Sequence, residues 1–473
     1  MSCPFGHVSE IPLISIKPAQ RTDPQIGSKI ILYDLNFIWT DEHWPPSKLN
    51  QLRSIGDPVI DRFFDTYGHQ LQHNDDIYQF LDELNRKNSE HICDDSCRNV
   101  CFFTFTKTIR QRPAWFDRDQ IIVGQEFFLK YYPLPVFSIF FYTLTLGYGF
   151  QQLNNVLIRT QYLSAVDLHE TYRRLIETFQ MIVYAICGNV DNFNETFLDV
   201  IRVRILHGMV RHKLRKLHRA YQSIPVNQED SLVTLLGFSF AVLQCLEERM
   251  GISISTKDRQ GYLHLWRYIG WLIGIRDEYL GPFSTYDSTR IISESIFYHF
   301  YAPSSMTKHL VHHSLMGFYL HTILPFSFQS FNGFSQKLIG KEMSAALGID
   351  RPELDLVHRG FIEFIFRAFR IYGWIVGLNL PMIHRRLIVY RRRRLKYDVR
   401  KALKNRLRNF ALFRNETSVH QTNVNCPCGY IEKQDQGIVK TNDLFIFRFK
   451  QSSFNFVAIF LLFLTFIVIN LFI

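Results

Sequence analysis

The chain has 473 residues, of which 47% are hydrophobic and 15% aromatic, including 43 phenylalanines. This composition excludes an intrinsically disordered chain and is sufficient for one large hydrophobic core or two smaller ones. The formal net charge of +11 is concentrated between Arg385 and Arg408, where twelve lysines and arginines accompany one acid, so the rest of the chain is close to neutral. Eight cysteines at irregular spacing do not describe a disulfide framework, which indicates a reducing compartment.

The amino-terminal segment, residues 1–75, is interrupted by prolines, and we expect an arm that lies over a helical domain. Within it, Asp57-Pro58 predicts the start of a helix, and residues 70–90 have the apolar spacing of another. Segments of alternating apolar and polar residues, which would predict strands, are not prominent anywhere in the chain. No repeat of fixed period is present either.

From Arg112 onward the helical pattern is clearer. Asp117 is placed to cap a helix, because its carboxylate can accept hydrogen bonds from the first free backbone N–H groups. The apolar run Val136–Phe150 follows this helix. It is shorter than the about 20 residues that a transmembrane helix needs. We therefore interpret this run as a buried helix.

A helix predicted from about Glu195 to Ala220 contains His207. The apolar residues of this helix recur at helical spacing, and they are Val203, Leu206, Val210 and Leu214. His207 lies on the same stripe, so its imidazole is expected to point toward the core. A buried histidine is either hydrogen-bonded to a backbone carbonyl or a ligand of a metal or haem, because neutral imidazole is a common ligand. The helix alone favours the hydrogen-bonded core histidine.

Gly208 directly follows this histidine. A glycine inside a helix costs about 1 kcal/mol relative to alanine. Its presence therefore indicates a place where something flat or bulky comes close. Arg202, Arg204 and Arg211 fall mostly on other faces of the helix, so we expect their charges to point outward.

Residues 153–188 predict one or two helices before the His207 helix. Within them Thr171, Arg174 and Thr178 recur at helical spacing, so a guanidinium and a hydroxyl share one face. Glu177 lies three residues after Arg174. The simplest interpretation is a surface ion pair between these two, worth a few tenths of a kcal/mol.

The second half of the chain also predicts helices. Asn227 or Ser231 is placed to cap an apolar helix over Leu232–Leu246. In a later helix, Gly270 and Gly274 are four residues apart and allow a neighbouring helix or a flat ligand to approach closely. Further helices are expected over residues 286–330 and 336–380. The fold is therefore predicted to be all-α.

The carboxy-terminal tail, residues 454–473, is predicted to be a transmembrane anchor. Only Thr465 and Asn470 are polar between Phe456 and Ile473, and an apolar helix of this length spans most of a hydrocarbon core of roughly 30 Å. The positive flank before it favours a cytosolic domain. We expect a tail-anchored protein, with the endoplasmic reticulum as the default membrane. Residues 409–453 are polar and are predicted to form a linker.

Within the basic stretch Arg385–Arg408, the run Arg391–Arg394 has two open interpretations. It can lie near anionic lipid headgroups, where each cation contributes about 1 kcal/mol, or it can be a solvated helix face. Nucleic-acid binding by the whole stretch Arg385–Arg408 is not expected, because its aromatic residues are limited to Tyr390 and Tyr397. A lipid membrane is thus the expected partner.

Five stretches of the chain resemble, in order, the motifs of the rubber oxygenase (latex clearing protein) and endoplasmic-reticulum-bound mpaB oxygenase family. They are Arg112-Pro113-Ala114-Trp115 with Val123-Gly124-Gln125, Arg174-x-x-Glu177-Thr178, Arg204-x-x-His207 with Val210-Arg211-His212, Pro225-Val226-Asn227-Gln228-Glu229-Asp230, and His264-Leu265-Trp266-Arg267-x-x-Gly270-x-x-x-Gly274. The resemblance covers roughly residues 105–380 of an expected helical domain over residues 76–408.

This resemblance implies a large, multi-helix, globin-like oxygenase domain with haem b. It implies that His207 is the proximal ligand of the iron and that Arg204 and Gly208 belong to the cofactor-binding helix. The implied activity is that of an oxidoreductase that uses dioxygen on an apolar small-molecule substrate. Rubber-cleaving members split polyisoprene, and the mpaB branch cleaves a farnesyl-derived chain.

Arg174, Glu177 and Thr178 occupy the positions of the family's catalytic Arg-x-x-Lys-Thr signature, with glutamate in place of lysine. In the rubber branch that lysine can occupy the distal side of the haem. The substitution leaves two hypotheses. The first is a membrane-anchored haem oxygenase that acts on an unsaturated lipid or isoprenoid. The second is a catalytically inactive relative that serves as a membrane-tethered lipid-binding or interaction protein.

Overall fold

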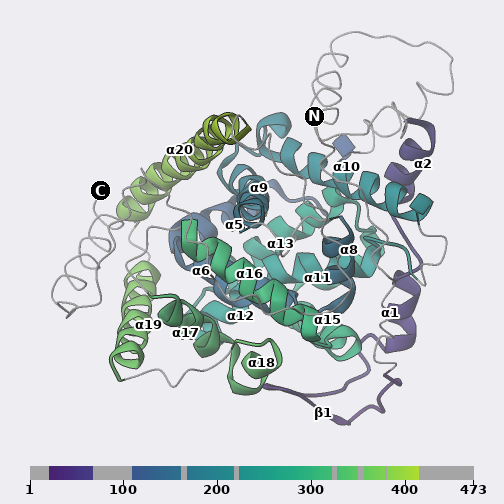
Figure 1. Cartoon of the computed structure of the whole chain (residues 1–473), viewed down its shortest axis with the longest axis horizontal. Helices are drawn as coiled ribbons and strands as arrows, with labels where there is room; N and C mark the ends of the chain where they lie inside the picture. The colour runs from purple at the N-terminus through teal and green to yellow at the C-terminus, as the bar shows by residue number, and fades with distance from the viewer. Residues whose placement is uncertain are drawn as a thin grey trace, which may run out of the picture. The chain divides into compact units, whose positions relative to one another are not determined.

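The computed structural model describes residues 21–67, 109–160, 168–217, 223–321, 327–349, 356–378 and 381–414. These residues are mostly helical, as Figure 1 shows, so the all-α prediction is confirmed for them. The chain divides into two units, Met1–Val399 and Arg400–Ile473. The predicted helix at 70–90 and the predicted anchor at 454–473 lie outside the described residues, as does the linker beyond residue 414.

The amino-terminal arm contains an antiparallel hairpin of strands β1 (Lys29–Leu32) and β2 (Leu35–Ile38), paired from Lys29 with Ile38 to Leu32 with Leu35. The expectation that no strand of note occurs was wrong here. Exposure alternates along both strands, but four residues are too short a run to distinguish this period in a sequence.

Two helices complete the arm, α1 (Pro46–Leu52) and α2 (Pro58–Tyr67). The predicted helix start at Asp57-Pro58 is confirmed. The Asp57 carboxylate accepts a hydrogen bond from the backbone N–H of Val59 at 3.2 Å, which satisfies one of the free donors of the first turn.

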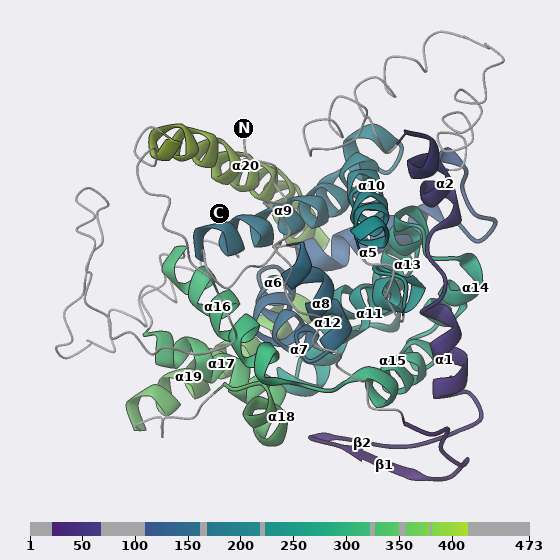
Figure 2. The ribbon, with the colours of Figure 1, turned by 45° about the vertical axis from the view of Figure 1, so that its right-hand side comes forward.

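The core is built around α5 (Arg118–Tyr131) and α13 (Thr256–Ile273), which lie side by side in Figure 2. Glycines allow this close approach, because a Cβ added to Gly124 would lie 2.8 Å from the carbonyl carbon of Gly261. The predicted cap of α5 is confirmed, since Asp117 Oδ1 accepts from the N–H groups of Asp119 at 2.9 Å and Gln120 at 3.1 Å.

The apolar run Val136–Phe150 is confirmed as buried helical structure. It is divided into α6 (Leu134–Ser138), the π-helical η1 (Ile139–Leu144) and α7 (Thr145–Gly147). One continuous helical stretch in the described part of the chain, Gln228–Arg249, has the length and hydropathy to cross a membrane. Within the most apolar 18 residues of this stretch, 67% are buried inside the protein, so it has the character of a core helix.

The part of the chain before and after His207 in sequence forms a series of helical segments. They are α8 (Gln151–Arg159), α9 (Leu168–Cys187), α10 (Phe193–Leu217), α11 (Gln228–Phe238), α12 (Phe240–Gln244) and the π-helical η2 (Cys245–Arg249). A short turn joins α9 to α10, which contact each other, and Gln180 Nε2 of α9 donates to Asp199 Oδ2 of α10 at 3.1 Å. Of the two predicted caps of α11, the structure uses Asn227, in a reciprocal capping box with Asp230.

The remaining helices are α14 (Asp277–Leu280), the 3-10 helix η3 (Gly281–Ser284), α15 (Tyr286–Phe300), α16 (Ser305–His321), α17 (Phe328–Ile339), α18 (Lys341–Ala346), α19 (Leu356–Gly377) and α20 (Pro381–Arg414). Phenylalanine rings join several of these helices to the α6–η1 segment. Phe137 lies 4.9 Å from Phe369, and Phe141 lies 4.5 Å from Phe331, measured between ring centroids. Such edge-to-face contacts account for part of the high phenylalanine content.

Candidate functional site

His207 lies in the middle of α10 and is the best candidate for a ligand of a cofactor. Among the described residues it makes no hydrogen bond or ion pair, so the hydrogen-bonded core histidine is not what the structure contains. Although the residue keeps part of its accessible surface, desolvation by the surrounding protein and, to a smaller extent, the nearby Arg211 charge together lower the pKa of His207 to about 4. The ring is therefore neutral at physiological pH, with a nitrogen lone pair available.

Arg204, one turn before this histidine, is buried rather than outward-facing. Its Nε donates to Asp57 Oδ2 at 2.6 Å and its Nη2 donates to Asp57 Oδ1 at 3.0 Å. Its Nη1 donates to the carbonyl of Leu272 at 3.4 Å. The guanidinium is thus engaged by protein on each of its three nitrogens. Its predicted part in cofactor binding remains a prediction, and its observed role is to fix α10 against α2 and α13.

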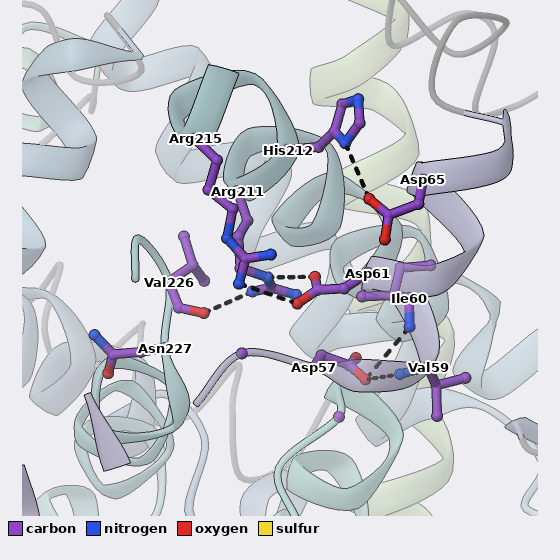
Figure 3. Close-up of polar contacts among 12 residues, drawn as sticks. Asp57, Val59, Ile60, Asp61, Asp65, Arg211, His212, Arg215, Val226 and Asn227 are labelled. Carbon is purple, nitrogen blue, oxygen red and sulfur yellow. Dashed lines mark hydrogen bonds and ion pairs between the residues drawn. The ribbon is translucent and has the colours of Figure 1, made fainter. Parts of the chain in front are cut away.

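Arg211, one turn after His207, forms a second buried ion pair with α2, shown in Figure 3. Its Nε donates to Asp61 Oδ1 at 2.5 Å and its Nη1 donates to the carbonyl of Val226 at 2.6 Å. Arg215 reaches the other oxygen of Asp61 at 3.4 Å. The expectation that these charges point outward was therefore wrong for Arg204 and Arg211, because their acidic partners lie about 150 residues earlier in the chain.

The remaining nitrogen of the Arg211 guanidinium, Nη2, is not satisfied in the same way as Nε and Nη1. This nitrogen is buried and has no hydrogen-bond partner among the residues that the structure describes. A buried donor of this kind is costly unless a further group satisfies it. Together with the neutral imidazole of His207, it gives this face of α10 one free ligand nitrogen and one free cationic donor.

Glycines and an amide side chain close the site around the two ion pairs. A Cβ on Gly56 would lie 2.5 Å from Asp61 Oδ2, and one on Gly274 would lie 2.9 Å from Arg204 Nε. Gly274 also has a φ of +101°, which favours glycine. Gln228 Nε2 donates to the carbonyls of both glycines, at 2.8 and 3.0 Å, so that one buried side chain joins the two loops.

Gly208 faces α2. A Cβ at this position would lie 2.7 Å from Ile60 Cγ1 and 2.8 Å from Phe64 Cε2. The bulky neighbour that the glycine predicted is therefore a helix of the arm. Further along the contact between α10 and α2, His212 Nδ1 lies 4.0 Å from Asp65 Oδ1, near the surface. Gly208 thus serves the packing of α10, and a direct contact with a cofactor remains a prediction.

Arg174, Glu177 and Thr178 lie on α9, the helix that packs against α10. Arg174 Nη1 donates to Glu177 Oε2 at 3.1 Å, as predicted, but the pair is not at the surface: only 5% and 14% of the two side chains are exposed. Thr178 Oγ1 donates to the carbonyl of Arg174 at 3.1 Å. The glutamate that replaces the family's lysine is therefore held by the arginine of the same signature.

A second buried cluster of charged groups surrounds the start of α11. Glu229 Oε1 lies 2.9 Å from His299 Nδ1. Burial raises the pKa of Glu229 well above its ordinary value and lowers the pKa of His299 to about 4, with the Arg53 charge lowering both. Burial also raises the pKa of Asp230 to about 6. This cluster joins the arm, α11 and α15.

The residues that the sequence did not identify are those of the arm. Asp57, directly before α2, and Asp61 and Asp65, within it, are spaced by four and face basic residues of α10 in the same order along the chain. The spacing of these acids was the available signal. Among the described residues, no group of three or more histidines, cysteines and acids gathers as a metal site. Such a cluster is not required for the haem that the resemblance implies, because a single imidazole of the protein can hold a haem iron.

The fold and these residues define the class of protein, a helical domain with a buried-face histidine placed to hold a cofactor. The model of the family "ER-bound oxygenase mpaB/B'/Rubber oxygenase, catalytic domain" matches residues 138–375, which is half of the chain and lies inside the stretch that carries the resemblance. The chain belongs to this family. The match includes α9, α10, α11 and α13, and therefore His207 and the Arg174–Thr178 signature.

Two comparisons show how this chain relates to known proteins. It is 26% identical over 117 residues to the rubber oxygenase of Streptomyces sp. (strain K30), a match that covers 23% of this chain and 28% of that protein. Its fold is similar to the solved structure of latex clearing protein in the closed state, with a TM-score of 0.51 and 19% identity over 76% of this chain and 95% of that one. At that identity the structural likeness concerns the fold.

Proposed function

We propose that this protein is a haem-dependent oxygenase that uses dioxygen to cleave or oxygenate an unsaturated apolar chain of the lipid or isoprenoid class. The observation that carries the proposal is His207. Its imidazole is neutral, has no hydrogen-bond partner among the described residues, and lies between two buried ion pairs. Membership of a family described as ER-bound and rubber oxygenases supports the same chemistry.

The residues present fit haem b. Bound haem supplies an iron that activates dioxygen. His207 would hold the iron, since an imidazole whose pKa is about 4 already has an unprotonated nitrogen at physiological pH. The unpartnered Nη2 of Arg211 would donate to an acidic side group of the cofactor. The Arg204–Asp57 and Arg211–Asp61 pairs would hold α10 in place, which fixes the orientation of the ring.

The Arg174, Glu177 and Thr178 signature would set the polarity of the α9 side. Because Arg174 neutralises Glu177 across 3.1 Å, the glutamate brings no uncompensated charge to an apolar substrate. The lysine of the resembled signature is thus replaced in this chain by an internal ion pair, so no lysine at this position would be available to a bound haem. Thr178 is kept as in the family pattern.

We also propose that residues 454–473 anchor the chain in the membrane of the endoplasmic reticulum, with the helical domain in the cytosol. The apolar length of this segment and the family description as ER-bound support the proposal. A membrane-anchored domain would meet substrates that partition into lipid, which suits an unsaturated isoprenoid.

The test uses the full chain in neutral detergent, supplied with haem and dioxygen. Squalene serves as an isoprenoid probe and linoleate as an unsaturated fatty-acid probe, and the readouts are dioxygen uptake and carbonyl products by mass spectrometry. The proposal predicts uptake and products with at least one probe, and their loss in His207→Ala and without dioxygen. A folded, haem-loaded protein that consumes no dioxygen with either probe would favour the inactive, lipid-binding relative.

A further inference from the structure

We propose that α19 and α20 form a surface that docks on a bilayer of anionic lipid, separately from the apolar tail. The α19–α20 surface is defined by residues within Met1–Val399, namely Ile371, Trp374, Leu378, Arg385, Arg386, Val389, Arg393 and Tyr397. The proposal does not depend on the haem site. It gives the helical domain its own contact with the membrane.

The apolar part of this surface lies at the end of α19. Ile371, Trp374 and Leu378 follow each other at spacings of three and four residues, so they share one side of the helix. Their exposed fractions are 57%, 67% and 50%. Three large apolar side chains on one exposed helix face are unusual for a surface that meets only water, and tryptophan is the residue that bilayer interfaces prefer.

The basic part of the surface lies on α20. Arg385, Arg386 and Arg393 are exposed, and Val389 and Tyr397 lie among them with exposed fractions of 47% and 55%. The opposite face of the same helix is buried and consists of His384, Leu387, Arg391, Leu395 and Val399. The exposed arginines therefore lie on one outer face of α20, whereas Arg391, the first residue of the run predicted to lie near headgroups, is buried on the opposite face.

One buried arginine joins the inner faces of the two helices. Arg391 Nη2 donates to the Tyr372 hydroxyl at 2.7 Å, and its Nη1 donates to the carbonyls of Leu129 and Lys130 at 2.8 and 2.9 Å, at the end of α5. The Tyr372 hydroxyl donates to the carbonyl of Tyr132 at 2.7 Å. Because both inner faces point at α5, the outer faces of α19 and α20 point away from the core. Figures 1 and 2 both show these helices on the same side of the helical domain.

A bilayer fits this combination better than the other candidate partners. Phosphates of a nucleic acid would bind the arginines but would leave the isoleucine and leucine side chains in water. A second copy of the chain would bring the same positive charges together. An anionic membrane offers phosphates to the arginines and an apolar layer to Trp374 within a few ångströms of each other. The apolar sequence of residues 454–473 would in addition keep the domain near a bilayer.

The experiment measures the contact of Trp374 with lipid in the full chain. The protein is reconstituted in vesicles of brominated phosphatidylcholine, with or without phosphatidylserine, and tryptophan quenching is recorded. Since the chain has six tryptophans, Trp374→Phe gives the signal of the other five. The tail is present in every sample, so a difference reports the α19–α20 surface alone.

The proposal predicts that Trp374 is quenched in anionic vesicles and much less in neutral ones, and that high salt reverses the difference. Replacing Arg385, Arg386 and Arg393 by serine should lower the ratio of docked to undocked protein roughly a hundredfold. The matched control replaces the exposed Lys29, Lys257 and Lys341 by serine and should keep the quenching.

Three results would overturn the proposal. The first is a Trp374 signal that stays unquenched in anionic vesicles. The second is Trp374 quenching that is the same in the arginine-to-serine variant, the lysine-to-serine control and the wild type. The third is a Trp374 signal that changes with protein concentration, or on addition of RNA, but not with lipid, which would assign the surface to a second copy or to a nucleic acid.

Discussion

Arg204 and Asp57 form a buried, two-point ion pair one turn from His207, although they are 147 residues apart in the chain. The same Asp57 also caps the start of α2. One carboxylate therefore fixes both the beginning of an arm helix and the orientation of the helix that carries the candidate ligand. This relationship makes the arm, which the sequence suggested only lies over the domain, part of the site.

The first prediction concerns this pair. Asp57→Asn should lower the free energy of unfolding by about 3 kcal/mol or more, because it leaves the Arg204 guanidinium buried without its countercharge. Urea unfolding followed by circular dichroism in neutral detergent measures the change. Asp287→Asn, which removes the partner of Arg290 in a pair at the surface, is the control and should change stability by less than about 1 kcal/mol. Equal effects of the two substitutions would contradict the structural role given to Asp57.

The second prediction concerns Gly208. Gly208→Ala should destabilise the protein by about 1–3 kcal/mol, because the new methyl group would collide with Ile60 and Phe64 of α2. The matched control is Gly360→Ala in α19, where a Cβ would meet nothing within 4 Å and where the better helix propensity of alanine should give up to about 1 kcal/mol of stabilisation. Thermal unfolding of both variants shows whether each substitution stabilises or destabilises the protein. Stabilisation by both would mean that α2 does not lie against Gly208.

The third prediction is a pH dependence from the buried Glu229–His299 contact. The folded state lowers the pKa of His299 from 6.5 to about 4, so the stability that depends on this group is present above pH 6.5 and is lost as the pH falls toward 4. The pKa of Glu229 is raised above 4.5, so its contribution is present below pH 4.5 and is lost as the pH rises through the raised value.

Single substitutions separate the two opposite pH dependences of stability. The stability difference between wild type and His299→Gln should grow with pH between 4 and 6.5, and the difference between wild type and Glu229→Gln should shrink as pH rises above 4.5. Each slope is at most about 1.4 kcal/mol per pH unit. Urea titrations at several pH values give both. Differences that do not change with pH would show that the pKa values of neither group are shifted.

How much of the fold and of the candidate site could be predicted from the sequence depends on how far apart in the chain the contacting residues lie. Local signals were sufficient for the cap at Asp117, the buried run Val136–Phe150 and the helix that contains His207. The expected outward direction of Arg204 and Arg211 was wrong, because helical spacing shows which residues share a face but not which distant segment covers it. The sequence offered one unused signal, the four-residue spacing of Asp57, Asp61 and Asp65.

The fourth prediction compares two substitutions at Glu177. Glu177→Lys restores the family's lysine, but it should destabilise the protein more than Glu177→Gln, because it puts a second cation beside the buried Arg174. Thermal unfolding gives the order of the two variants. If Glu177→Lys is more stable than Glu177→Gln, the buried Arg174 does not need an acidic partner at position 177, and the prediction is contradicted.

The measurement that tests the central claim most directly is the absorption spectrum of the full chain, produced with haem supply and purified in neutral detergent, beside His207→Ala and His212→Ala. His212 is the matched control, since it lies on the same helix but faces Asp65 and Phe64 near the surface. We predict a Soret band in wild type and in His212→Ala that is lost in His207→Ala. A folded wild type without the band, or a band lost only in His212→Ala, would contradict His207 as the haem ligand.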